Sequence, residues 1–240
     1  MPVFKHDGSI KRVLVVVAHP DDVDFGSAGT VAYLTKKDVA VSYCLVTSGD
    51  AGGDDSTHTR EERTAFRENE QRAAAAEVGV TDLTFLRWPD GQVEATLLLR
   101  REIARVIRTV KPDLVITQSP ERNYARIRAS HPDHRAVGEA TMNAVYPDAR
   151  NPHAFPELAR EGFEPHTVGT VWLAGASPTM VVDITKTFKN KIAALSRHES
   201  QVGHRADLKR FVRGWSRETA RAAGLGKARL AEGFRVVDTA

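Results

Sequence analysis

The sequence predicts an α/β fold: a Rossmann-like, mainly parallel sheet flanked by helices. Residues 13–17 are an unbroken run of Val and Leu, which is typical of a parallel strand buried on both faces. Apolar strand-like runs then alternate with helical stretches, as in repeated βαβ units. The length of 240 residues and the 41% of hydrophobic residues suit one domain of this class. We therefore expect residues 1–240 to form a single domain.

The elements of the amino-terminal half follow from local composition. We expect strands at 13–17, 39–47 and 83–87, and helices at 26–37, 60–78 and 94–110. Gly79 ends the second helix, because glycine readily adopts the left-handed conformation found at helix C-termini. The stretch 48–59, rich in Gly, Asp, Ser and Thr, predicts a loop, and Pro89-Asp90-Gly91 predicts a turn.

The carboxy-terminal half contains less regular pattern. We expect strands at 114–117, 170–174 and 180–183, and helices from Pro132 to about Val145, at 186–197 and at 207–223, the last closing the chain. Pro132 suits the first turn of its helix, where a missing N–H costs nothing. The last two strands are compatible with a hairpin around Ser177 and Pro178. Residues 118–130 predict a polar loop, and the Pro-rich stretch 147–165 predicts an irregular excursion.

Composition excludes several classes of protein. Cys44 lies in an apolar stretch, which predicts a place in the core. Because it is the single cysteine, an intramolecular disulfide is excluded, and a reducing compartment is expected. Neither a signal peptide nor a long apolar segment is visible, which predicts a cytoplasmic protein without a membrane span. The formal net charge is only +3, with both signs interspersed. The Arg-rich stretch 197–221 lacks an aromatic ladder, so we interpret it as a solvated face or subunit contact and expect no nucleic-acid partner.

Two short motifs carry the chemistry: His-Pro-Asp-Asp at 19–22 and His-Pro-Asp-His at 131–134. The first directly follows the strand at 13–17, where open α/β sheets form their ligand crevice. A dinucleotide-binding protein would have a Gly-x-Gly-x-x-Gly turn there. The run Gly26-Ser27-Ala28-Gly29 matches only part of a phosphate-binding loop, so we interpret these glycines as sites of close helix packing.

These motifs contain the donors of a catalytic zinc site. Two His and one carboxylate commonly hold zinc and leave one position for water, and His19, Asp22 and His134 can supply that set. The adjacent Asp21 can stay free as a base. Each motif also has an ordinary interpretation, as a helix cap or as surface histidines near a helix start.

His131 precedes His134 by three residues and could stand on the open side of such a metal, where a tetrahedral oxyanion or leaving amine forms. Asp133 could bond the other ring nitrogen of His131 and favour its protonated form. The basic residues Arg122, Arg126, Arg128 and Arg135 flank this motif and could attract an anionic substrate group, or simply belong to a solvated loop.

The chain resembles the N-acetylglucosaminyl-phosphatidylinositol de-N-acetylase family, also called the LmbE-like or PIG-L deacetylases. The resemblance covers nearly the whole chain and is carried by residues 18–22 with Gly29 and Thr30, 67–79, 90–91, 131–134 and 191–201. It implies a single LmbE-like domain that hydrolyses N-acetyl groups of glucosamine-containing small molecules. It also implies one Zn²⁺ per chain, with other divalent metals possible, and a homo-oligomer, because several bacterial relatives form trimers or hexamers.

The resemblance also implies roles for individual residues. The zinc ligands are His19, Asp22 and His134, which agrees with the set chosen from donor chemistry. Asp21 is the general base, and His131 is the general acid or oxyanion stabiliser with Asp133 behind it. Arg67 and Asp90 match positions that contact the sugar or its aglycone in some members.

Arg67 and Asp90 also have ordinary interpretations. Arg67 could form a surface ion pair with Glu70 along a helix, and Asp90 could belong to a generic turn. His198 could approach the rim of the site, but a helix-end residue facing solvent is the expectation we adopt.

The chain departs from the family pattern near both motifs. Many members have Glu directly after the Asp pair, whereas this chain has Val23 and then Asp24. Some members use a gating Tyr two residues before the second motif; this chain has Ala129 there, and Tyr124 is a candidate substitute. These departures leave the metal site intact and concern the identity of the substrate.

Three other functions stay open. A thiol-conjugate amidase or a natural-product deacetylase would keep the metal and change the amide that is cleaved. A non-catalytic Rossmann-like binder of nucleotides or sugar phosphates would use these His and Asp residues structurally, and would bind no stoichiometric zinc.

Overall fold

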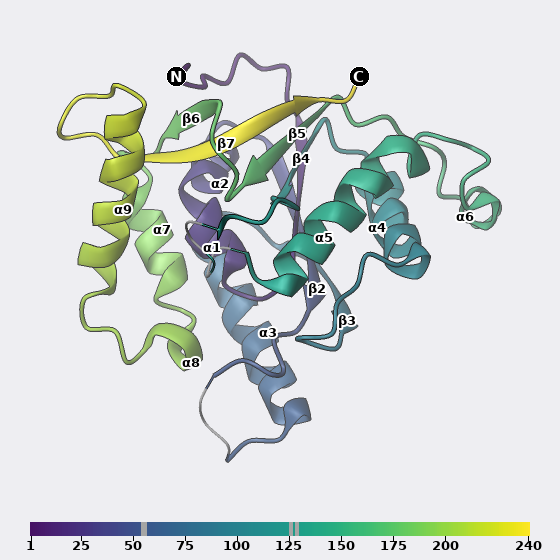
Figure 1. The fold of residues 1–240 in the computed structure, drawn as a ribbon, viewed down its shortest axis with the longest axis horizontal. Coiled ribbons are helices and arrows are strands. Elements are labelled where there is room, and N and C mark those ends of the chain that lie inside the picture. The colour runs from purple at the N-terminus through teal and green to yellow at the C-terminus, as the bar shows by residue number, and fades with distance from the viewer. Residues whose placement is uncertain (54–56, 125–126, 128–129) are drawn as a thin grey trace.

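The computed structural model describes all residues except 54–56, 125–126 and 128–129 (Figure 1). Its centre is a seven-stranded sheet of order β3-β2-β1-β4-β5-β7-β6. The strands are β1 Arg12–Val17, β2 Ala40–Thr47, β3 Asp82–Trp88, β4 Leu114–Gln118, β5 Thr170–Ala174, β6 Met180–Asp183 and β7 Ala231–Asp238. The first five strands pair in parallel, and β7 is antiparallel to both of its neighbours. The predicted α/β class with a mainly parallel sheet is confirmed.

Helices cover both faces of this sheet (Figure 1). They are α1 Asp22–Gly26, α2 Ala28–Thr35, α3 Arg60–Glu77, α4 Leu97–Val110, α5 Pro132–Asn143, the π-helical turn η2 Ala144–Asp148, α6 Pro156–Arg160, α7 Phe188–Leu195, α8 Glu199–Val202 and α9 Leu208–Ala222. Along β1, Val13 and Val15 enter the core formed with α2, α3 and α7, while Leu14 and Val16 enter the core formed with α4 and α5. The unbroken apolar run is thus explained by burial on both faces.

The final strand is the main difference from the prediction. Residues after the last helix form β7, which lies between β5 and β6, so the expected β5–β6 hairpin is wrong. Glu232 interrupts the apolar pattern of β7 and is nevertheless buried, because its carboxylate lies 2.6 Å from Nζ of the buried Lys191. Short α6 also forms within the stretch expected to be irregular. The helix expected at 26–37 corresponds to α2, Ala28–Thr35, and the additional short helix α1 precedes it.

Two glycines bring helices close enough to build the functional edge of the sheet. A Cβ on Gly29 would lie 2.8 Å from Ile184, which confirms that this glycine serves close packing. A Cβ on Gly138 would lie 2.3 Å from the carbonyl oxygen of Gln118 at the end of β4. Helix α5 therefore lies directly against β4, and its first turn reaches the carboxyl end of the neighbouring β1.

Cys44 is buried in the core as expected. Within the described residues, we find no helix with both the length and the apolar character needed to cross a membrane.

Candidate metal and catalytic site

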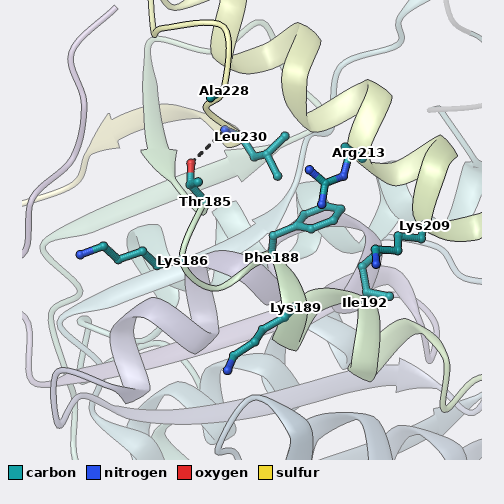
Figure 2. A pocket seen from close by; sticks show the side chains of 9 residues that line it. All are labelled: Thr185, Lys186, Phe188, Lys189, Ile192, Lys209, Arg213, Ala228 and Leu230. Carbon is teal, nitrogen blue, oxygen red and sulfur yellow. Dashed lines mark hydrogen bonds between the residues drawn. The ribbon is translucent and has the colours of Figure 1, made fainter.

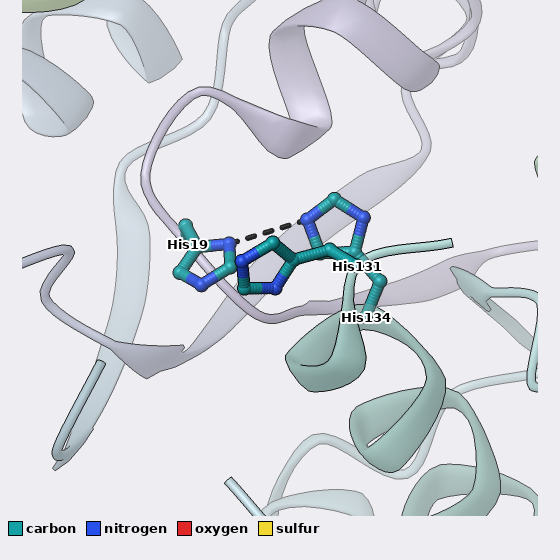
Figure 3. Close-up of side chains that lie close together, drawn as sticks. All are labelled: His19, His131 and His134. Carbon is teal, nitrogen blue, oxygen red and sulfur yellow. Dashed lines mark hydrogen bonds between the residues drawn. The ribbon is translucent and has the colours of Figure 1, made fainter. Parts of the chain in front are cut away.

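The fold brings the two motifs together at the carboxyl edge of the sheet. His19 follows β1, whereas His131 and His134 belong to the start of α5, and the three imidazoles gather at that point (Figure 3). His19 Nδ1 lies 3.2 Å from His134 Nε2, although 115 positions separate the two residues. The predicted convergence of the motifs is therefore present in the structure.

Asp22 completes a compact donor set. Its Oδ1 lies 3.0 Å from His134 Nε2, and its Oδ2 lies 3.2 Å from His19 Nδ1. Ligand atoms around a tetrahedral zinc ion, at bond lengths of about 2.0–2.2 Å, lie roughly 3.3 Å from one another. The three side chains thus fit a divalent metal in both chemistry and spacing. Burial alone would raise the pKa of Asp22, but the imidazoles of His134 and His19 hold it well below its usual value.

His19 is supported from its opposite nitrogen by two carboxylates. Its Nε2 lies 3.0 Å from Asp90 Oδ1 and 3.2 Å from Asp133 Oδ2. Burial opposes a charged imidazole, yet Asp133, Asp22 and Asp90 outweigh it and raise the pKa of His19 to about 12. The same surplus of negative charge favours a divalent cation bound at Nδ1, with Nε2–H donating to the carboxylates behind it.

His19, Asp90 and Asp133 themselves form a second group of possible metal ligands. Both carboxylates already accept backbone N–H groups, Asp90 from Ala51 at 3.1 Å and Asp133 from Gly91 at 2.7 Å. These three residues are also buried. The other group of possible ligands is His19, His131 and His134, of which His131 is exposed, so it offers the access to solvent and substrate that a catalytic metal needs.

Asp21 is adjacent to Asp22 but has different surroundings. Its backbone is left-handed, with φ of 89°, immediately before α1 begins. Its Oδ2 accepts a hydrogen bond from Arg67 Nη2 at 3.2 Å. Burial and the negative charge of Asp22 raise the pKa of Asp21 to about 6, although Arg67 acts in the opposite direction. A carboxylate with such a pKa is well suited to act as a general base near neutral pH.

The predicted bond between the Asp133 carboxylate and His131 is wrong. His131 is the N-cap of α5, and its Nδ1 accepts the backbone N–H of Asp133 at 3.2 Å. This capping bond leaves the Asp133 side chain facing His19 instead. Burial and the neighbouring imidazoles of His19 and His134 lower the pKa of His131, which opposes the expected protonated form.

Arg67 lies behind the site. It is 3% exposed and donates to the carbonyl oxygens of Pro20 and Gly49 as well as to Asp21. The alternative of a surface ion pair with Glu70 is therefore wrong. Glycine is required at position 49, because its φ is +67° and a Cβ there would lie 2.3 Å from Arg67 Nη1. In this structure Arg67 supports Asp21, and its predicted contact with the sugar stays a prediction.

Asp90 is likewise turned inward, toward His19, and its predicted sugar contact also stays a prediction. Around the second motif, Tyr124 is exposed and Arg135 donates to the carbonyl oxygen of Pro120. Arg126, Arg128 and Ala129 lie outside the described residues. The proposed attraction of an anionic group by this segment therefore stays a prediction.

The structure adds Asp24 and Gln71 to the surroundings of the site and corrects the expectation for His198. His198 is fully buried rather than solvent-facing, and its Nε2 lies 2.8 Å from Oδ2 of the buried Asp24. Asp24 also accepts a hydrogen bond from Gln71. The sequence feature that indicates a buried carboxylate here is the position of Asp24 among apolar neighbours at the start of a helix.

A separate hollow of about 350 Å³ lies between α7 and α9 (Figure 2). Its described lining combines apolar side chains such as Phe188 with the basic Lys186, Lys189, Lys209 and Arg213. The lining contains neither an imidazole nor a carboxylate, so this hollow is not a competing metal site. Within the Arg-rich stretch, Arg213 covers the ring of Phe188.

Comparison with known proteins agrees with the site chemistry. The family described as PIG-L, GlcNAc-PI de-N-acetylase, matches residues 14–145, which include both motifs. A diacetylchitobiose deacetylase of Thermococcus kodakarensis is 32% identical over 194 residues, covering 80% of this chain and 70% of that protein. A probable N-acetyl-alpha-D-glucosaminyl L-malate deacetylase 2 of Bacillus anthracis is 32% identical over 207 residues, covering 83% of this chain and 86% of that protein.

The fold is shared with a solved structure over nearly its full length. The N,N'-diacetylchitobiose deacetylase of Pyrococcus horikoshii superposes with a TM-score of 0.87 at 27% identity. The match covers 96% of this chain and 85% of that one. Because one fold can host unrelated reactions, the functional conclusion depends on the site as well as on this similarity.

Proposed function

Because this chain belongs to the PIG-L family of GlcNAc-PI de-N-acetylases, we propose that it is a zinc-dependent hydrolase that removes the N-acetyl group from a glucosamine-containing small molecule. One observation carries the proposal: His19, Asp22 and His134 meet with donor atoms 3.0–3.2 Å apart. The relatives act on different N-acetylated sugars by name, so the substrate class is shared and the aglycone is open. The sheet uses strands from residue 12 to residue 238, which supports a single domain over 1–240.

His19, Asp22 and His134 would hold one Zn²⁺ per chain. When bound, such an ion polarises the amide carbonyl and lowers the pKa of a water molecule. Asp90 and Asp133 hold the His19 ring through Nε2, so that Nδ1 is presented on the metal side. The acetamide would enter on the side of the exposed His131.

Asp21 accepts a proton from the attacking water. Its pKa of about 6 leaves it ionised at neutral pH and still basic enough to take up that proton. Arg67 fixes the carboxylate from behind by the contact at Oδ2, and it also holds the Pro20 carbonyl just before it. As the C–N bond breaks, the proton held by Asp21 passes to the departing nitrogen, which yields acetate and a free amine.

His131 stabilises the negative charge that develops on the amide oxygen. Its Nδ1 accepts a backbone N–H, so in the neutral ring the proton is on Nε2, which becomes a hydrogen-bond donor. The lowered pKa of His131 favours this neutral form. Of the two roles that the family resemblance implies, the geometry favours the oxyanion donor over the general acid.

The test is acetate release by the zinc-loaded protein from a panel of substrates. The panel contains N-acetylglucosamine, N,N'-diacetylchitobiose, an N-acetylglucosaminyl malate, an N-acetylated thiol conjugate and an N-acyl glycopeptide sugar. We expect release from at least one acetamido sugar. Asp21→Asn should keep zinc and lose nearly all turnover, whereas His134→Ala should lose zinc. A protein without stoichiometric zinc and without acetate release would instead be a binding module.

A further inference from the structure

A buried chain of hydrogen bonds lies behind the left-handed turn at Asp21. We propose that Gln71, held by Asp24 and His198, is a positioning residue that fixes the backbone of Asp21. This inference rests on the proposed function, because it assigns a purpose to the placement of the general base. None of these three residues belongs to the metal ligands or to the groups placed at the substrate.

The chain joins three separate parts of the sequence. The backbone N–H of Asp21 donates to Gln71 Oε1 at 2.9 Å, and Gln71 Nε2 donates to Asp24 Oδ2 at 3.0 Å. His198 Nε2 lies 2.8 Å from the same oxygen of Asp24. Gln71 belongs to α3, Asp24 to α1, and His198 directly precedes α8. All three side chains are fully buried.

The chemistry of the donors makes this chain directional. A backbone N–H can only donate, so the Asp21 end requires the oxygen of the Gln71 amide. The amide nitrogen must then face an acceptor, and the carboxylate of Asp24 provides one. Since a carboxylate only accepts, His198 donates to Asp24 and fixes its orientation. Each link therefore holds the amide of Gln71 in one of its two possible orientations.

Asp21 has a specific need for such support. A φ of 89° is a strained conformation for a residue with a Cβ. The Gln71 bond holds the N–H of Asp21, while Arg67 holds its carboxylate and the preceding carbonyl of Pro20. Loss of the Gln71 bond frees one side of the turn and lets the carboxylate move relative to Asp22. A displacement of about 1 Å in a catalytic group can reduce the rate roughly a hundredfold.

The hydrogen bonding of the network is incomplete, which favours a positioning role over a purely stabilising one. Asp24 Oδ1 and His198 Nδ1 are buried and have no hydrogen-bond partner in the part of the chain that the structure describes. Buried polar atoms without partners destabilise a fold. An apolar packing of the same volume would avoid this cost. The polar chain is therefore better explained by the directional bond that it delivers to Asp21.

The decisive variants are Gln71→Leu, His198→Leu and His198→Gln. For Gln71→Leu and His198→Leu we expect kcat to fall roughly 10- to 100-fold, with KM and zinc content unchanged. His198→Gln keeps an N–H donor near the position of Nε2 and should restore most of kcat. A role in packing alone predicts the reverse order, because Leu suits a fully buried site better than Gln.

A second readout does not depend on activity. The exchange rate of the Asp21 amide proton, measured by NMR, should rise in Gln71→Leu and His198→Leu and return toward wild type in His198→Gln. His166→Leu is the matched control. This half-buried histidine has its Nε2 2.8 Å from the carbonyl oxygen of Pro112, which precedes β4 and so lies at the amino ends of the parallel strands, away from the site. It should leave both kcat and Asp21 exchange unchanged.

The outcomes separate the two proposals. If the wild type releases no acetate from any substrate, the proposed function fails, and amide exchange still tests the hydrogen-bonded chain. Unchanged Asp21 exchange and kcat in Gln71→Leu would overturn the positioning role. If Gln71→Leu does not fold, His198→Leu and His198→Gln provide the test. Equal losses of kcat in these two variants would contradict the proposed chain of hydrogen bonds.

Discussion

Removing both carboxylates behind His19 should weaken metal binding without abolishing it. Asp90→Asn and Asp133→Asn keep side-chain volume and remove the charges that face His19 Nε2 at 3.0 and 3.2 Å. Either carboxylate alone still orients the ring, so each single variant should lose about tenfold in zinc affinity. The double variant should lose about a hundredfold, because such supporting groups contribute roughly 10- to 100-fold.

These losses in zinc affinity correspond to about 1.4 kcal/mol of binding free energy for each single variant and about 2.7 kcal/mol for the double variant. The assay is competition for zinc with a chromophoric chelator, with unfolding by urea as a control for folding. Unchanged zinc affinity in the double variant would refute the role of Asp90 and Asp133 in supporting His19. Complete loss of binding in either single variant would instead mean that Asp90 and Asp133 are themselves the ligands.

Two further substitutions test neighbouring parts of the structure. Arg67→Met should lower kcat about 10- to 100-fold with zinc content unchanged, because the guanidinium supports Asp21; a change confined to KM would restore the sugar-contact interpretation. Lys191→Met should reduce the free energy of unfolding by about 3 kcal/mol, because it leaves the buried Glu232 carboxylate without its cation. Glu232 keeps backbone and hydroxyl donors, which sets the loss at the lower end of the usual range; urea unfolding would contradict this if the loss were below about 1 kcal/mol.

The sequence predicts an element well when one physical cause explains its pattern of apolar and polar residues. The run at 13–17 is apolar because both faces of β1 are buried, so its position and type could be read directly. The same holds for the motifs, because the end of a parallel strand is where an α/β fold places its ligands. These two facts sufficed to predict that His19 and His134 would meet.

The failures involve polar residues whose partners are distant in sequence. Strand β7 was missed because its buried Glu232 is neutralised by Lys191, a pairing that no local pattern reveals. His198 was assigned to solvent for the same reason, since Asp24 lies 174 positions away. Asp133 was paired with His131 because the two are close in sequence, whereas the capping geometry of α5 turns its carboxylate toward His19.

Binding of one ion by His19, Asp22 and His134 is the basis of the proposed function. Anomalous diffraction at the zinc edge from crystals of the zinc-loaded protein tests it most directly. We predict one peak per chain, bonded to His19 Nδ1, to the carboxylate of Asp22 and to His134 Nε2. A peak at His19 Nε2 between Asp90 and Asp133, or no peak at all, would contradict the account.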